Sequence, residues 1–511
     1  MFYISLCLCL LFVSTYGANI LCIFMTPSVS HQIVFQPVWK ELSLRGHQVS
    51  VYTPSPINDK SLTNLTEHDL SFSYEVFRNA SNFEISDSAS DENVMNVILA
   101  LNEAAESQLN HSFLQDVIKN VNNDTYDLLI VEFMWQSFYA FKEVYKVPMV
   151  GLLSIPISTT MADALGIDKH PVVHPDVFLK FSFARNFKER LESWIFSWAY
   201  RLFFRYKIAP VFDKQIKKYF SDVTKSSNQL VKEVELVIGS SNFALDNVKA
   251  RNGKYIPVSS LHVQPIQPLP KDLAEYLDNL KTDVIYFSLG TNVKSSKIPK
   301  ESMDIIIKVL AALPYSILWK SDLINLPKNI PKNFHIRKWY PQQDLLGHAK
   351  IKLFITQGGC QSIDEAVDRR VPMLIMPVYG DQPNNADKCV SRGIAERINI
   401  YDFTSDELRT KLDTLLNNSS YKANIIKLAE IMRDQPLSAL DTAVFWIEYV
   451  IRHKGASHLQ PATLTLPFYQ YYLLDVYLFV GFIFYIFVYI SKKIVSSFSK
   501  RFKAKKKQKS N

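Results

Sequence analysis

Short hydrophobic runs alternate with longer amphipathic segments along most of the chain. In the first half, the expected strands are 20–25, 48–53, 127–132 and 147–153, and the expected helices are 36–44 and 133–145. The second half repeats the alternation, with expected strands at 284–289, 316–319, 335–337, 352–356 and 373–376. Because strands separated by helices pair in parallel through right-handed crossovers, we expect an α/β protein with two parallel sheets.

A proline-rich segment separates the two halves. Pro265, Pro268 and Pro270 lie within residues 258–270, where the alternation stops. A chain of 511 residues is long enough to bury two cores. The expected domains are an N-terminal domain at 18–258 and a C-terminal domain at 273–470, joined by a linker at 259–272.

A long apolar run near the end of the chain predicts a transmembrane helix. Residues 473–490 are apolar or aromatic except for Asp475, and as a helix they reach about 27 Å, enough to span a bilayer. Tyrosines precede the run and the basic tail 491–511 follows it, the flanks typical of a span. A hydrophobic core helix is the alternative, but it does not explain the basic tail.

Residues 1–17 are expected to be a cleavable signal peptide, because an apolar run precedes several small residues. A buried first strand is the alternative, and it does not suit so long a run ahead of the strand at 20–25. Together with the late span, this predicts a type I membrane protein with a lumenal body and a cytosolic tail. Residues 507–511 resemble a lysine-based retrieval signal, which implies the endoplasmic reticulum membrane. Glycosylation sequons support a lumenal body and lie at Asn64, Asn79, Asn110, Asn123, Asn417 and Asn418.

Charge and cysteine content exclude other classes of protein. The formal net charge is +8, but the tail alone holds nine Lys or Arg and no acid, so the rest of the chain carries −1. A nucleic-acid-binding body is therefore not expected. Cys7 and Cys9 belong to the expected signal peptide, and Cys22, Cys360 and Cys389 have neither a metal-ligand spacing nor a disulfide pattern.

Residues 354–385 carry the densest chemical signal. After the strand at 352–356, Gly358 and Gly359 allow a tight turn, and Ser362 and Glu365 have the spacing of a helix capping box. The N–H groups at such a helix start favour phosphate. Gly380, Asp381 and Gln382 follow the next strand, at the carboxyl edge of the expected sheet, where ligands bind.

This stretch resembles the signature of the UDP-glycosyltransferases, which usually runs Phe-Ile-Thr-His-Gly-Gly, then Glu-Ala, Gly-Val-Pro and Gly-Asp-Gln. The chain matches it at Gly358, Gly359, Glu365, Ala366, Val371, Pro372, Gly380, Asp381 and Gln382. It departs at Gln357, where histidine is usual, and at Gln361, where asparagine is common. The Thr-Gln-Gly-Gly variant is similar to some insect members and to baculovirus ecdysteroid glucosyltransferases. The resemblance implies the glycosyltransferase-B fold, in which two Rossmann-like domains face each other across a cleft.

His31 and Glu132 are the expected catalytic pair. His31 follows the first strand in what reads as a loop, and Glu132 ends a strand, so both are expected at the carboxyl edge of the N-terminal sheet. An imidazole accepts protons near neutral pH, and a carboxylate can orient it. The resemblance implies that His31 is the catalytic base, and many relatives have aspartate where this chain has Glu132.

The resemblance also implies the residues of the donor site. Trp339 would stack on uracil, Gln342 would bond uracil or ribose, and Glu365 would hold the ribose. Ser288, Gly290, Thr291, Gln357, Gly358, Gly359 and Ser362 would surround the phosphates, and Asp381 and Gln382 would bind the hexose hydroxyls. The alternatives are that Trp339 is a core aromatic and that Glu365 closes the capping box. Gln357 can donate a hydrogen bond but carries no full charge, so we expect donor binding to be retained.

The expected reaction is an inverting, metal-independent transfer of a hexose from a UDP-sugar to small lipophilic acceptors. UDP-glucose is favoured, with UDP-glucuronate as the alternative donor. The chain lacks an Asp-x-Asp motif, so no metal or other cofactor is expected beside the UDP-sugar. The alternative function is a non-catalytic, membrane-anchored carrier or receptor for small apolar ligands. The sequence leaves the acceptor and the oligomeric state open, a homo-oligomer included.

Overall fold

The computed structural model describes residues 17–80, 91–120, 125–291, 293, 298–322 and 330–508. The expected signal peptide, apart from Gly17, and the sequon at Asn123 lie outside the described residues. The chain divides into two units, Met1–Gln460 and Pro461–Asn511. The first unit contains both parallel sheets, and the second contains the long C-terminal helix.

The N-terminal half is built on a seven-stranded parallel sheet with the order β3-β2-β1-β4-β5-β6-β7. The strands are β1 Asn19–Ile23, β2 Gln48–Thr53, β3 Leu65–Asp69, β4 Leu128–Glu132, β5 Met149–Leu153, β6 Leu236–Gly239 and β7 Tyr255–Pro257. Its helical segments are α2 Val29–Leu44, α3 Ser73–Ala80, α4 Asp91–Leu109, α5 Ser112–Lys119, η1 Gln136–Ala140, α6 Phe141–Tyr145, α7 Thr159–Ala164, α8 Phe187–Phe203, η2 Phe204–Ile208, α9 Ala209–Tyr219, α10 Ser227–Leu230 and η3 Val231–Glu233.

Successive residues of β1 enter different cores. Leu21 and Ile23 belong to one hydrophobic cluster, whereas Ile20 and Cys22 belong to another. This follows from the alternation of side chains across a strand. Both faces of the sheet are therefore covered, as expected for a parallel sheet.

The C-terminal half has a six-stranded parallel sheet with the order β10-β9-β8-β11-β12-β13. The strands are β8 Val284–Ser288, β9 Ser316–Lys320, β10 Phe334–Arg337, β11 Ile351–Thr356, β12 Met373–Ile375 and β13 Ala395–Arg397. The helices are α11 Lys271–Asn279, α12 Lys300–Ala311, α13 Gln342–Leu346, α14 Cys360–Asp368, α15 Gln382–Ser391, α16 Ser405–Asn417, α17 Ser419–Arg433 and α18 Ala439–Arg452.

Both sheets reverse their strand order at an equivalent place. β1 lies between β2 and β4, and β8 lies between β9 and β11. The chain leaves such a pair of strands toward opposite faces of the sheet, which opens a crevice at their carboxyl ends. Each sheet therefore has its ligand-binding edge at the ends of these central strands.

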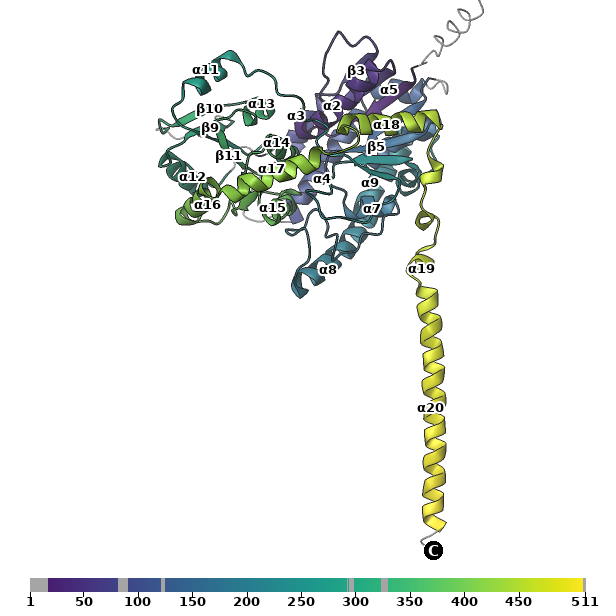
Figure 1. Ribbon diagram of the computed structural model, residues 1–511. Coiled ribbons are helices and arrows are strands. Elements are labelled where there is room, and N and C mark those ends of the chain that lie inside the picture. Colours follow the sequence, from purple (N-terminus) through teal and green to yellow (C-terminus); the bar gives the residue numbers. More distant parts are fainter. Residues whose placement is uncertain are drawn as a thin grey trace, which may run out of the picture. The chain divides into compact units, whose positions relative to one another are not determined.

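The last helix of the first unit returns to the N-terminal half. Helix α18 lies beside α2 (Figure 1). Ala443, Val444, Ile447 and Val450 of α18 belong to the same buried cluster as Phe35 of α2. An ion pair of 2.8 Å between Arg45 and Asp441 continues this packing at the surface. The two halves are therefore connected by α18 packing as well as by the linker.

All nine expected strands are present, and the expectation of two parallel sheets is confirmed. Residues 258–270 contain no helix or strand, as the prolines predict. The expected helix at 36–44 begins earlier, at Val29. The expected helix at 133–145 was wrong in form, because a turn and the 3-10 segment η1 precede the short α6. Strands β3, β6, β7 and β13 were not predicted.

The second unit contains η6 Ala462–Leu464, α19 Phe468–Tyr471 and α20 Leu474–Gln508, and the short η5 Ser457–Leu459 joins it to the first unit. Over the described residues, α20 is the helix long and apolar enough to cross a membrane. Most of its apolar side chains are exposed, Phe479 to 63% and Phe484 to 66%. This agrees with the transmembrane helix expected at 473–490.

Candidate functional site

His31 and Glu132 are in contact at the carboxyl edge of the N-terminal sheet. His31 Nδ1 lies 3.1 Å from Glu132 Oε1, and the backbone N–H of Thr26 donates to Glu132 Oε2 at 2.9 Å. Glu132 is the last residue of β4 and is only 2% exposed. The expectation that His31 lies in a loop was wrong. It is in the first turn of α2, since this helix begins at Val29 and its N-cap is Ser28.

This geometry determines which ring nitrogen is free. A carboxylate only accepts hydrogen bonds, so a proton on Nδ1 makes the contact with Glu132 favourable. The same tautomer leaves Nε2 unprotonated, and Nε2 makes no hydrogen bond with any described residue. The pair can therefore take up a proton at Nε2, while Glu132 stabilises the resulting positive charge.

Two turns meet at the carboxyl edge of the C-terminal sheet. Ser288 ends β8 and pairs with Thr356, which ends β11, so Gly290 and Gln357 follow adjacent strand ends. Gly290 has φ +76°, and a Cβ there would lie 2.1 Å from Gln357 Nε2. The Gly290 N–H donates to Ser288 Oγ at 3.3 Å. The structure thus brings together Ser288, Gly290 and Gln357, with Thr291 exposed directly after them.

Gly358 and Gly359 lead into α14. Gly358 has φ +86°, a left-handed conformation that favours glycine. Gly359 is the N-cap of α14 and has no side chain to cap it. The capping box expected from Ser362 and Glu365 was therefore wrong, because Ser362 lies in the first turn and not at the N-cap. The free N–H groups at this helix start can bind an anion.

Ser362 and Glu365 are held by a glutamine from α13. Gln342 Nε2 lies 3.0 Å from Ser362 Oγ and donates to Glu365 Oε2 at 2.6 Å. His262 Nε2 lies 3.4 Å from Glu365 Oε1. Burial opposes the charge on His262, but Glu365, Asp364 and the backbone of Gln361 raise its pKa. Gln342, Ser362 and Glu365 therefore form one connected group beside the start of α14.

Trp339 projects from the loop before α13 and is 59% exposed. This excludes the alternative that it is a core aromatic. The ammonium of Lys320 lies 4.5 Å from the centre of its ring. An exposed aromatic face at the carboxyl edge of the sheet can stack on a planar base.

Lys320 was missed in the sequence. It ends β9 beside Ser288, and its Nζ donates to the carbonyl oxygen of Gly290 at 3.0 Å. Burial lowers the pKa of Lys320 to about 8, opposed by the Glu365 carboxylate. Among the described residues no ion pair joins Lys320 to a carboxylate within 4 Å. The signal that could have found it is a lysine at the carboxyl end of a strand next to β8.

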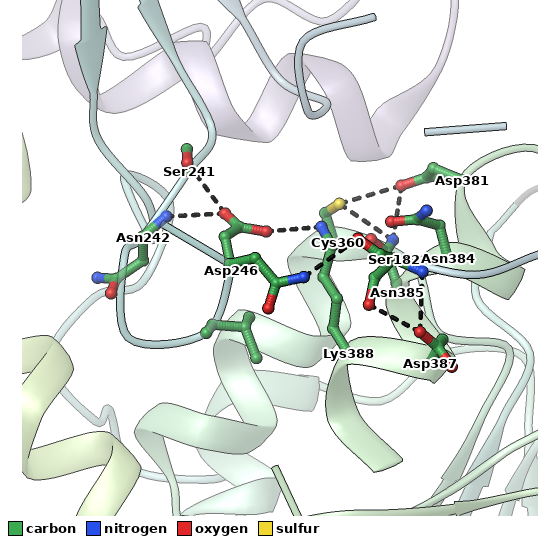
Figure 2. A network of polar contacts seen from close by, with 12 residues as sticks. Ser182, Ser241, Asn242, Asp246, Cys360, Asp381, Asn384, Asn385, Asp387 and Lys388 are labelled. Carbon is green, nitrogen blue, oxygen red and sulfur yellow. Dashed lines mark hydrogen bonds and ion pairs between the residues drawn. The ribbon is translucent and has the colours of Figure 1, made fainter. Parts of the chain in front are cut away.

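Asp381 and Gln382 lie at the start of α15. Asp381 Oδ2 accepts from the thiol of Cys360 at 3.0 Å and from Asn385 Nδ2 at 2.7 Å (Figure 2). Gln382 Oε1 accepts from the backbone N–H groups of Val378 and Tyr379 at 2.8 and 3.2 Å. The second oxygen of Asp381 and the amide nitrogen of Gln382 make no hydrogen bond with other described residues.

The rest of α15 ties the two halves together (Figure 2). Lys388 makes a 2.6 Å ion pair with Asp246, and both side chains are at most 9% exposed. Burial opposes the charge on Asp246, but Lys388 and Lys249 lower its pKa to about 2. Asp387 accepts from the backbone N–H and the hydroxyl of Ser182 at 2.8 and 2.7 Å. These contacts fix α15, whose N-cap is Asp381, against the N-terminal half.

The chain resembles known proteins over nearly its whole length. The family model described as "UDP-glucoronosyl and UDP-glucosyl transferase" matches residues 19–509. UDP-glucosyltransferase 2 of Dactylopius coccus is 31% identical over 494 residues, covering 94% of this chain and 92% of that protein. UDP-glucuronosyltransferase 2B7 of Homo sapiens is 31% identical over 486 residues, covering 89% and 88%.

Solved structures resemble the fold. The glycotransferase of kitacinnamycin has a TM-score of 0.57 at 16% identity and covers 85% of this chain and 99% of its own. The glycosyltransferase VinC in complex with DTDP has a TM-score of 0.55 at 16% identity, with coverage of 86% and 100%. These likenesses and the two parallel sheets confirm the glycosyltransferase-B fold.

Proposed function

We propose that this chain, which belongs to the family of UDP-glucuronosyl and UDP-glucosyl transferases, transfers glucose from UDP-glucose to a hydroxyl group of a small lipophilic acceptor. Family membership makes it a glycosyltransferase that moves a sugar from a UDP-sugar to an acceptor, and the carrier hypothesis is therefore set aside. The choice of sugar, the class of acceptor and the roles of individual residues are the proposal.

The observation that carries the proposal is the contact between His31 and Glu132. Nε2 of His31 removes the proton of the acceptor hydroxyl as its oxygen attacks the anomeric carbon of the sugar. The new carbon–oxygen bond forms while the bond to the UDP oxygen breaks, and UDP leaves with the electron pair. Glu132 stabilises the imidazolium formed in this step. A single displacement of this kind inverts the anomeric configuration.

The donor would lie along the edge of the C-terminal sheet. Trp339 offers a stacking face for uracil, and the connected group of Gln342, Ser362 and Glu365 offers oxygens and a hydroxyl for ribose and phosphate. The start of α14, Gly290 and Lys320 are available for the diphosphate, whose negative charge increases as the bond breaks. We propose that the chain's own groups take up this charge without a metal or another cofactor.

Asp381 and Gln382 are proposed to bind the sugar. Each keeps polar atoms free at the start of α15, next to the turn at Gly358. Glucose is favoured because a relative matching 94% of the chain is named a UDP-glucosyltransferase. The human relative of equal identity is named a UDP-glucuronosyltransferase, so UDP-glucuronate is the competing donor.

We also propose that α20 anchors the enzyme in the endoplasmic reticulum membrane with the catalytic body in the lumen. The length and apolar composition of α20 and the basic tail support the anchor. A lumenal body places the sequons where glycosylation takes place.

The test is turnover by the full chain in microsomes. UDP-glucose or UDP-glucuronate is supplied with a panel of phenols and steroids, and the wild type is compared with His31→Ala. The proposal expects conjugates from UDP-glucose in the wild type and a near-complete loss in the variant. Binding of acceptors without consumption of any UDP-sugar, or full activity of His31→Ala, would contradict it.

A further inference from the structure

A second side chain contacts the Nδ1 atom of His31. The hydroxyl of Ser154 lies 2.8 Å from Nδ1, closer than Glu132 Oε1 at 3.1 Å. Ser154 follows β5 directly and is completely buried. No motif in the sequence pointed to this serine.

Only one tautomer of His31 suits both neighbours of Nδ1. If Ser154 donated to an unprotonated Nδ1, the carboxylate of Glu132 would face the ring lone pair, which is unfavourable. With the proton on Nδ1, the carboxylate and the hydroxyl oxygen both lie within reach as acceptors. Two acceptors, one at the end of β4 and one directly after β5, restrict the rotation of the ring more than one does.

Ser154 is in turn held from the opposite half of the enzyme. Gln361 Nε2 of α14 donates to the backbone carbonyl oxygen of Ser154 at 2.9 Å. The backbone of Gln361 is itself fixed, because its backbone carbonyl oxygen lies 3.2 Å from His262 Nε2. Helix α14, whose start lies at the proposed phosphate site, is thus joined through the Gln361 side chain to Ser154, which contacts the proposed base.

The length of the Gln361 side chain matters for this contact. An asparagine at position 361, the residue common in the family signature, would be shorter by one carbon–carbon bond of about 1.5 Å. It could not keep a 2.9 Å hydrogen bond to Ser154 without movement of the backbone. Glutamine in place of the usual asparagine at position 361 therefore allows the hydrogen bond to Ser154 in this chain.

We propose that Ser154 and Gln361 are positioning residues for His31, and that Gln361 couples the place of the donor-binding helix α14 to the orientation of the base. This rests on the role of His31 in the proposed function. When α14 is in place against the N-terminal half, Gln361 holds Ser154, and Ser154 with Glu132 holds the ring with Nε2 free. The base is then correctly oriented only when the two halves are engaged.

The experiment compares four variants of the full chain in microsomes, with UDP-glucose and a phenol as substrates. Gln361→Asn shortens the side chain, Gln361→Glu keeps its length but removes the N–H donor, and Ser154→Ala removes the hydroxyl. Ser154→Ala combined with Gln361→Asn completes a double-mutant cycle. Circular dichroism and the affinity for UDP serve as controls for folding and for donor binding.

We expect kcat to fall about tenfold in each single variant, since a misplaced base is costly, while KM for UDP-glucose stays unchanged. The double variant should lose no more activity than Ser154→Ala alone, because Gln361 acts through Ser154. Modification of His31 by diethyl pyrocarbonate, measured by mass spectrometry against the exposed His453, should become faster in Gln361→Asn as the ring loosens.

Two outcomes would overturn the inference. If Gln361→Asn raised KM for UDP-glucose at an unchanged kcat and added fully to Ser154→Ala, Gln361 would be a donor ligand only. If all four variants behaved like the wild type while His31→Ala was inactive, the positioning role would fall and the proposed function would stand. Full activity of His31→Ala would remove both.

Discussion

The two sheet edges of this enzyme share a topology but are equipped differently. At the N-terminal edge, one histidine and one carboxylate face each other, and Nε2 of the histidine is left without a described partner. At the C-terminal edge, Gln342, Ser362 and Glu365 are bonded to one another, and the start of α14 offers backbone N–H groups. The first arrangement suits a proton transfer, and the second suits the holding of a large polar donor. In the proposed function, one topology therefore supplies both the base and the donor site of a transfer reaction.

The largest expected effect is on kcat, and it distinguishes the N-terminal edge from the C-terminal edge. His31→Ala should lower kcat by about 10³-fold, because the proposed general base is lost. The affinity for UDP, measured by calorimetry, should stay the same, since the proposed donor site lies at the other edge. A parallel loss of UDP affinity would show that the division of labour between the edges is wrong.

Glu132→Gln tests the charge of the N-terminal pair. The glutamine keeps the size of the side chain but does not stabilise an imidazolium, and it can offer Nδ1 a donor where an acceptor is needed. We expect kcat to fall about 10²-fold, less than for His31→Ala. Initial rates at saturating UDP-glucose measure the effect. Equal activity of Glu132→Gln and the wild type would mean that Glu132 has only a structural role.

Lys320 tests the charge at the C-terminal edge through its pH dependence. Because burial lowers its pKa to about 8, the free enzyme holds this lysine mostly neutral at pH 9. A bound diphosphate favours the charged form, so UDP binding at pH 9 should take up a proton and weaken as the pH rises further. Calorimetry in buffers of different ionisation enthalpy measures the uptake, which should vanish in Lys320→Met.

The same pKa gives a prediction for stability. Between about pH 8 and pH 10.5, Lys320 is protonated in the unfolded chain and neutral in the folded one. Its contribution to the free energy of unfolding therefore rises with pH in this window and is constant above it. Lys320→Met should remove this part of the pH dependence in thermal melts, and an unchanged slope would contradict the burial of the lysine.

The smallest expected effect concerns Gln357. Its amide packs against Gly290 and can donate to phosphate, but it carries no charge. Gln357→His would restore the usual family residue, and a charged donor bond is worth about 1.5–3 kcal/mol. We expect activity to be preserved or raised, as measured by kcat with UDP-glucose. Loss of activity would show that the glutamine is required and is more than a substitute.

The two edges also differ in how far the sequence predicted them. The proposed donor residues of the C-terminal half come mostly from one stretch and from strand ends, so strand periodicity and turn glycines place Gln357, Gly358 and Asp381 at the carboxyl edge of the sheet, where the structure has them. In the N-terminal half, the polar residues Ser28 and Ser30 obscured the start of α2, so His31 was assigned to a loop.

Other features depend on contacts that local patterns do not contain. The capping box failed because Gly359 takes the N-cap and leaves Ser362 to a bond from α13. Ser154 and Gln361 are more than 200 residues apart, and Lys320 is defined only by the strand order that sets it beside Ser288. Such contacts depend on which strands lie side by side. The sequence predicted two parallel sheets but not the order of their strands.

The anomeric configuration of the product tests the central claim most directly. If His31 and the departing UDP act from opposite sides of the sugar in one step, α-linked UDP-glucose must give a β-glucoside. Nuclear magnetic resonance of the conjugate formed by the wild-type enzyme reads this configuration. A β-linked product is the predicted result, and an α-linked product would contradict a single displacement between the two edges.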